Sequence, residues 1–180
     1  MKIKKIKKTG GVALELAPEE QALPGTASES KISLKKVLVP VDFSDCSEKT
    51  VRYALAFAAG SKAEVVFVHI VEPYTPTPEM LMIDVASIES AAYQAAKKLL
   101  RRIVTQSKLI APCSSEIRIG KPWVEIIRLA KESGADLIVV STHGRTGLAH
   151  VLLGSTAEQI VRHAGCPVLV VREKERDFVA

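Results

Sequence analysis

The sequence predicts an α/β fold: a single doubly wound parallel sheet of five strands with helices on both faces. From Lys35 onward, apolar runs typical of buried strands alternate with segments of helical periodicity, a pattern that indicates right-handed strand–helix–strand crossovers. The chain is 47% hydrophobic but only 4% aromatic, so its core is expected to be aliphatic. Strands buried on both faces of a parallel sheet have this composition.

Strands are expected at residues 37–42, 65–71, 115–119, 137–140 and 168–171. The third alternates polar and apolar residues, as an edge strand does, and we expect the spatial order 3-2-1-4-5. Helices are expected at residues 47–59, 84–108, 123–133 and 154–163. Gly60 and Gly134 follow the first and third helices, where glycine commonly ends a helix.

Residues 1–34 differ from the rest of the chain and are predicted to form a basic N-terminal extension. Short runs on either side of Gly10-Gly11 predict a hairpin over 2–16, followed by a linker that contains proline, glycine and serine. A variable appendage is the other interpretation. We assign residues 35–175 to the main domain and 176–180 to a C-terminal tail.

The formal net charge is +5, and much of the excess lies in lysines near the N-terminus. No aromatic residues alternate with these lysines, so nucleic acid is not an expected partner. No apolar stretch is long enough to span a bilayer, so no membrane partner is expected. The three cysteines are widely spaced and form no CxxC pair, which favours a reducing compartment. We therefore expect a cytoplasmic protein.

Polar residues follow the first and fourth predicted strands. In a sheet of this order the two strands are neighbours, and ligands bind beyond their carboxyl ends. The carboxylate of Asp42 can accept hydrogen bonds from ribose hydroxyls or approach a divalent ion. Its alternative role is to cap the next helix, which Ser44 or Asp45 would do better. Three apolar residues are expected to flank a base: Val41, Ile70 and Val140.

The run Ser141-Thr-His-Gly-Arg-Thr-Gly147 leaves the fourth strand, and Gly154-Ser155-Thr156 opens the last helix. Glycines let backbone N–H groups approach an anion, and a helix N-terminus faces an anion favourably. A strand, a glycine-containing loop and a helix start predict phosphate binding, although such a loop also occurs as a plain turn. His143 either donates to phosphate or braces the loop, and the guanidinium of Arg145 is the better phosphate partner.

Several segments carry a family resemblance: Val37-Leu-Val-Pro-Val-Asp-Phe-Ser44, Val68-His69-Ile70, Gly120-Lys-Pro122, and a closing block from Ser141 to Val171. They resemble the universal stress protein family over residues 35–172. Nucleotide-binding members carry G-x2-G-x9-G-[ST]. Here Gly144, Gly154 and Ser155 match that motif in register, and Ser141 stands in place of its first glycine.

The resemblance implies an adenine nucleotide alpha-hydrolase-like fold, ATP as the ligand, with or without Mg²⁺, and a nucleotide-dependent role as a stress-response sensor or adaptor. Family members are usually homodimers joined through the last strand, here Pro167 to Val171, and an exposed sheet edge is ordinarily paired or covered. The protein partner is not indicated. The predicted nucleotide-binding residues are Pro40, Val41, Asp42, Ser44, Ile70, Val140, Ser141, His143, Gly144, Arg145, Gly147, Gly154, Ser155 and Thr156.

Two other functions stay open. The first is a dimeric stress-response scaffold without nucleotide, because serine at position 141 weakens binding if that position needs a positive φ. The second is a slow ATPase, although the spacing predicts neither a catalytic set nor metal ligands. Adenylyl-transferring relatives need HxGH after the first strand, and ATP pyrophosphatases need a glycine-serine loop there; Phe43-Ser44-Asp45 provides neither. We expect at most weak ATP hydrolysis.

Overall fold

The computed structural model describes residues 2–5, 12–15, 33–74, 84–142, 153–172, 176, 177 and 179. The chain divides into two units, Met1–Ile32 and Ser33–Ala180. In the first unit, β1 (Lys2–Lys5) and β2 (Val12–Glu15) pair antiparallel, with Lys2 opposite Glu15. These strands lie in the segment where the sequence predicts a hairpin.

The second unit is built on a five-stranded parallel sheet, which confirms the predicted fold class. Its order is β5-β4-β3-β6-β7, or 3-2-1-4-5 when the strands of this unit are counted along the chain. All neighbouring pairs are parallel. The strands are β3 (Lys36–Pro40), β4 (Glu64–Val71), β5 (Cys113–Ile119), β6 (Leu137–Ser141) and β7 (Val168–Val171).

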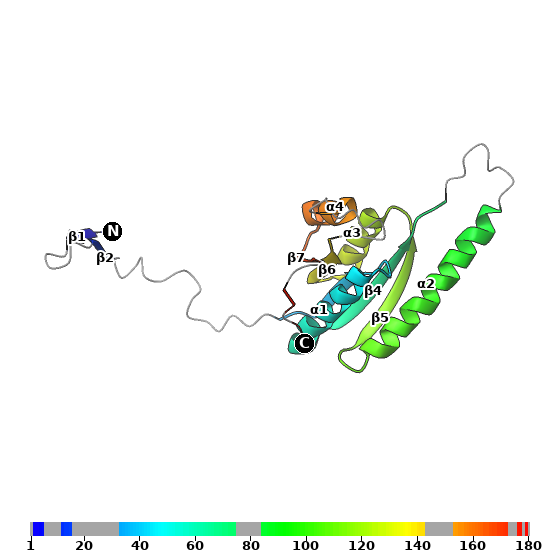
Figure 1. Ribbon diagram of the computed structural model, residues 1–180, viewed down its shortest axis with the longest axis horizontal. Helices are drawn as coiled ribbons and strands as arrows, with labels where there is room; N and C mark the ends of the chain where they lie inside the picture. The colour runs from blue at the N-terminus through cyan, green and yellow to red at the C-terminus, as the bar shows by residue number, and fades with distance from the viewer. Residues whose placement is uncertain are drawn as a thin grey trace. The chain divides into compact units, whose positions relative to one another are not determined.

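Helices cover both faces of this sheet (Figure 1). On one face lie α1 (Asp45–Ser61) and α2 (Val85–Ser107), whose buried Tyr53 and Leu100 share a core cluster with Phe67 of β4. On the other face lie α3 (Pro122–Ser133) and α4 (Ser155–His163). There Ile126 and Ile160 pack with Ile138 of β6 in a second cluster.

Strand β3 shows why the central strands consist of unbroken apolar runs. Val37 and Val39 belong to the cluster beneath α1 and α2, whereas Leu38 belongs to the cluster beneath α3 and α4. All three side chains have zero solvent exposure. Successive side chains of a strand point to opposite faces, so burial of both faces requires an apolar residue at every position.

The boundaries of α1 depart from the prediction. The helix runs through Gly60 to Ser61 and ends at Lys62, which has a left-handed φ of 58°. The N–H of Ala63 bonds the carbonyl of Ala58, and the Ala63 side chain is fully buried. Entry into β4 therefore decides where α1 ends, and the predicted stop at Gly60 is wrong. Gly134 does end α3, with a φ of 65°, which confirms the other glycine stop.

Strand β3 is shorter than predicted and ends at Pro40. The N–H of Val41 still bonds the carbonyl of Val68 at 2.8 Å, after which the chain turns into α1. Strand β5 begins at Cys113, two residues before the predicted start. The carboxyl ends of β3, β4 and β6 matter for function, because residues at these ends line one cavity.

Candidate functional site

A cavity of about 760 Å³ opens at the carboxyl ends of β3, β4 and β6. The starts of α3 and α4 contribute its other walls, through residues such as Trp123 and Ser155. In a doubly wound sheet, this is the switch point at which ligands bind. The volume lies within the range of cavities that hold small molecules and cofactors.

Asp42 presents an unsatisfied acceptor at this cavity. Its Oδ1 accepts the backbone N–H of Ser44 at 3.1 Å and the Ser44 hydroxyl at 2.6 Å. Its Oδ2 is buried and has no hydrogen-bond partner among the residues that the structure describes. A buried carboxylate oxygen without a partner is energetically unfavourable. A ligand that donates a hydrogen bond to this atom would remove that penalty.

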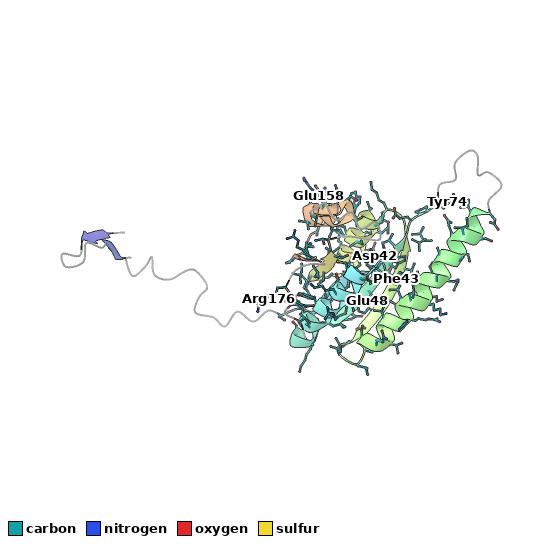
Figure 2. The ribbon with its side chains drawn as sticks, in the orientation of Figure 1. Asp42, Phe43, Glu48, Tyr74, Glu158 and Arg176 are labelled. Carbon is teal, nitrogen blue, oxygen red and sulfur yellow. The ribbon has the colours of Figure 1, made fainter. Side chains whose placement is uncertain are left out.

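The turn that carries Asp42 is strained and held in place by neighbouring groups. Phe43 has a φ of 65°, a left-handed conformation that bulky residues rarely adopt. Its ring lies 4.6 Å from the ring of His69, and Figure 2 labels Asp42 and Phe43 beside the start of α1. The Nδ1 of His69 lies 2.7 Å from the carbonyl oxygen of Val41. A carbonyl only accepts, so Nδ1 donates and the Nε2 of the neutral ring is an acceptor.

The N-terminus of α4 reaches the cavity without a side-chain cap. Its N-cap residue is Gly154, and within the described part of the chain it has no side-chain capping hydrogen bond; α3, which also starts at the cavity, lacks a side-chain cap as well. By contrast, Ser44 caps α1 and Asp84 caps α2. Uncapped N–H groups and the helix dipole together favour an anion.

The ends of the segment between β6 and α4 are tied together. The N–H of Gly154 bonds the carbonyl of Thr142 at 2.7 Å, and the N–H of Thr142 bonds the carbonyl of Val171 at 2.9 Å. Thr142 is only 2% exposed. The sheet therefore fixes both points from which the phosphate loop predicted by the sequence departs and returns.

Ser141 is the last residue of β6 and pairs with Val171. It is not among the described residues with a positive φ, and it lines the cavity. Serine therefore fits the backbone here, and the position needs no glycine for a left-handed conformation.

The chain matches a known protein family over most of its length. The model of the universal stress protein family matches residues 33–172. This chain belongs to the universal stress protein family. Universal stress protein MJ0531 of Methanocaldococcus jannaschii is 33% identical over 147 residues, which cover 79% of this chain and 85% of that protein.

Solved structures of universal stress proteins share the fold. The protein UspA from Lactobacillus plantarum superposes with a TM-score of 0.72 at 28% identity, covering 79% of this chain and all (100%) of that one. A universal stress protein solved in complex with cAMP superposes with a TM-score of 0.60 at 25% identity, covering 78% and 98% of the two chains. Members of this family with a similar fold therefore include a nucleotide-binding protein.

The universal stress protein fold brings together nine of the residues that the sequence predicts for the site. The following line one cavity: Pro40, Val41, Asp42, Ile70, Val140, Ser141, Gly154, Ser155 and Thr156. Ser44 is not among the lining residues, because its hydroxyl bonds Asp42 and accepts from the N–H of Ser47. His143, Gly144, Arg145 and Gly147 lie outside the described residues.

Sequence reasoning missed the wall that α3 contributes. Lys121 and Trp123 line the cavity, with the Lys121 ammonium 5.5 Å from the centre of the Trp123 ring. The ring of His163 from α4 stacks on Trp123 at 5.4 Å. The signal available was the Gly120-Lys-Pro122 segment, because it follows a strand at its carboxyl end. Trp123 is the only tryptophan in the sequence, which makes it a natural reporter of the cavity.

Gly120 and a buried glutamate position this wall. Gly120 has a φ of 147°, and a Cβ there would stand 3.0 Å from Cγ of Glu125. Glu125 is 7% exposed and pairs with Arg128 at 2.8 Å. Arg118 of β5 reaches Glu132 of α3 at 2.6 Å, and this hydrogen bond is the main cause of the raised pKa of Arg118. Glycine lets β5 turn directly into α3, and the Arg118–Glu132 ion pair holds α3 against the edge strand β5.

Among the described residues no three histidine, cysteine or acidic side chains gather as metal ligands. Within the same residues, no helix is both long and apolar enough to cross a bilayer. The cysteines at positions 46, 113 and 166 form no disulfide bond with one another. Burial raises the pKa of the Cys113 and Cys166 thiols, which keeps both in the neutral form that is the weaker nucleophile.

Proposed function

We propose that this universal stress protein binds an adenine nucleotide, with ATP as the ligand, in the cavity between β3 and β6. The observation that carries the proposal is the buried Oδ2 of Asp42, which has no partner on a cavity wall. A ribose hydroxyl is a neutral donor of suitable size to satisfy it. The other carboxylate oxygen is held by Ser44, so the free atom keeps a defined position.

The rest of the cavity supports a base at one end and phosphates at the other. Val41, Ile70 and Val140 supply apolar surface for adenine. The uncapped first turn of α4 supplies N–H groups for phosphate oxygens. In this proposal Gly144 and Arg145 complete the phosphate side, together with His143 and Gly147 of the same loop. The cAMP complex of a relative supports the ligand class rather than the number of phosphates.

The same cavity also suits a nucleotide that carries Mg²⁺. When bound, Mg²⁺ neutralises phosphate charge and prefers oxygen ligands, and Oδ2 of Asp42 is a free carboxylate oxygen at the cavity. Asp42 binds and orients in this scheme. We propose at most slow hydrolysis of ATP. Asp42, His69 and Glu72 line the cavity and carry basic groups, but the sequence spacing predicts no catalytic set.

We further propose that the protein acts in the cytoplasm as a homodimeric sensor or adaptor of the stress response, controlled by its bound nucleotide. Strand β7 ends the described sheet and pairs only with β6, so its outer edge suits pairing with a second copy. Bound nucleotide would make contacts with the loop after β6 that the free protein lacks. Such differential contacts are what a ligand-controlled switch requires.

The test uses Trp123 as the reporter. Titration with ATP should change the tryptophan fluorescence with a dissociation constant of about micromolar magnitude. Asp42→Asn keeps the shape but replaces the Oδ2 acceptor with a donor, so affinity should fall about tenfold or more. Asp45→Asn, at an exposed position three residues away, is the matched control and should stay within about twofold.

Nucleotide content should be measured beside the titration. Protein purified without added nucleotide is denatured, and the supernatant is separated by ion-pair chromatography. Stoichiometric ATP or ADP supports the proposal. An empty supernatant together with no calorimetric or fluorescence response at millimolar ATP would overturn it and leave the scaffold without nucleotide.

A further inference from the structure

The second half of α2 carries a concentration of unpaired positive charge. From residue 90 to residue 115 the chain contains no aspartate or glutamate. Five exposed cations lie in this stretch: Lys97, Lys98, Arg101, Arg102 and Lys108. None of them forms an ion pair with another described residue. Several cations elsewhere in this unit do form ion pairs, for example Arg52 with Asp177, Arg118 with Glu132 and Arg162 with Glu158.

Large aliphatic side chains are exposed in the same region. Leu109 is 91% exposed, Ile110 57% and Leu99 42%. Leu109 has the highest exposure of the large hydrophobic residues recorded in the described part of the chain. Isolated exposed apolar residues are ordinary, but three beside five unpaired cations form one amphipathic surface.

Helical spacing places charge and apolar surface on one side. Leu109 follows Lys98 by eleven residues, Arg101 by eight and Arg102 by seven, and these intervals share a helix face. A helical turn continues beyond Ser107, because the N–H groups of Ile110 and Ala111 both bond the Ser107 carbonyl. Leu99 and Ile110 flank this face. We call these residues (97–99, 101, 102 and 108–110) the basic face of α2.

We propose that the basic face of α2 binds the surface of an anionic phospholipid bilayer. Lysine and arginine attract anionic headgroups and can extend their charged ends past a buried aliphatic stem. Aliphatic side chains between them can enter the acyl boundary, as in amphipathic helices that lie on membranes. Nucleic acid fits less well, because phosphate contacts do not use exposed leucine and isoleucine, and the face has no aromatic ring for base stacking.

This contact is association with a membrane surface, so it goes beyond the sequence-based expectation of no membrane partner without requiring a spanning segment. It is also separate from the nucleotide cavity. The chain passes from the carboxyl end of β4 to the start of α2, and the end of α2 leads into the amino end of β5 (Figure 1). The end of α2 that carries the basic face therefore lies near the amino ends of the strands, whereas the cavity lies at their carboxyl ends.

The test is co-sedimentation of the full chain with vesicles of phosphatidylcholine containing about 30% phosphatidylglycerol, at low and at physiological salt. Each cation near an anionic surface strengthens partitioning on the order of fivefold. Arg101→Gln with Arg102→Gln should therefore weaken binding roughly 25-fold. The matched control is Lys62→Gln with Lys131→Gln, which removes the same charge from exposed positions elsewhere and should change binding by about twofold at most.

Leu109→Ser distinguishes vesicle binding by the basic face of α2 from binding by the lysines of the N-terminal extension, because it removes an apolar side chain of that face and changes no charge. It should weaken vesicle binding about tenfold, while vesicles of phosphatidylcholine alone bind none of the proteins. Circular dichroism should show unchanged folding, since Leu109 is already exposed. Equal losses in the test and control double variants, no effect of Leu109→Ser, or stronger binding to a DNA duplex than to vesicles would each overturn the proposal.

Discussion

Ser44 donates both its backbone N–H and its hydroxyl to a single oxygen of Asp42, at 3.1 and 2.6 Å, while the second oxygen of that carboxylate is buried and finds no partner in the described residues. The same hydroxyl accepts the N–H of Ser47 at 3.3 Å and so caps α1. One serine therefore starts the helix and orients the carboxylate at the cavity. Helix stability and the orientation of the Asp42 carboxylate are therefore coupled at this residue.

Ser44→Ala should lower the free energy of unfolding by about 1–2 kcal/mol, because the helix cap and one hydrogen bond to Asp42 are lost. Urea denaturation measures this change. Ser61→Ala is the control from the other end of α1, where the hydroxyl only bonds the Phe57 carbonyl; it should cost less than about 0.5 kcal/mol. Equal losses in the two variants would contradict the double role of Ser44.

Ser155→Asp should separate stability from phosphate binding. An acidic residue in the first turn of α4 interacts favourably with the helix dipole, so stability should stay equal or rise by about 0.3–1 kcal/mol. The same charge repels phosphate, so ATP affinity should fall about tenfold or more. Gln94→Glu adds the same charge at an exposed position of α2 and should leave affinity unchanged. Thermal unfolding measures the stability and ATP titration measures the affinity. Unchanged ATP affinity in Ser155→Asp would show that phosphate does not bind at the start of α4.

Asp136 should make stability depend on acid pH. Its Oδ2 accepts the N–H groups of Lys35 and Lys36 at 2.7 and 2.9 Å, and these bonds, that from Lys35 first, lower the pKa of its carboxyl. A lowered pKa in the folded state stabilises the protein above the unfolded pKa of about 3.9. That stabilisation is lost as the pH falls through the lower folded value.

The melting temperature of the wild type should therefore fall more steeply below about pH 4 than that of Asp136→Asn. The other carboxyls are the same in both proteins, so their contributions cancel in the difference. Melting curves from neutral to acid pH measure it. Parallel curves for the two proteins would show that the two hydrogen bonds do not depend on the charge of Asp136.

Val170→Pro should dissociate the proposed dimer without unfolding the subunit. The carbonyls of Pro167 and Val171 accept N–H groups from β6 and the residue after it, and alternate residues of a strand bond to opposite sides. The N–H of Val170 therefore faces the outer edge, where proline removes a bond to a partner copy only. Leu169→Pro, one residue away, loses a bond to β6 instead and should cost about 3 kcal/mol.

Sedimentation distinguishes these variants. The protein concentration should be about 100 µM, which is well above a dissociation constant of about micromolar magnitude. The wild type should sediment as a dimer and Val170→Pro as a folded monomer. A wild type that is monomeric at this concentration, or a Val170→Pro variant that stays dimeric, would exclude β7 as the dimer edge.

The sheet could be predicted because its signal is local. The apolar run of β3 needs burial on both faces, and such runs alternating with helical periodicity leave few topologies. Six of the nine predicted residues that line the cavity follow from the same reasoning, because neighbouring strand ends lie together; the other three open α4. Lys62 could not be predicted as the end of α1, since lysine has no preference for a left-handed conformation, whereas Gly60 does.

By itself, the sequence determined the fold class and the strand order and predicted a binding site at the ends of β3 and β6, because hydrophobic period and loop polarity are properties of short segments. Only the tertiary structure decided that Oδ2 of Asp42 lacks a partner, that Phe43 is held left-handed against His69, and that Trp123 joins the cavity wall. The physical reason is that these properties depend on contacts between segments far apart in the chain. Satisfaction of a buried atom and strain in a turn are set by what packs around them.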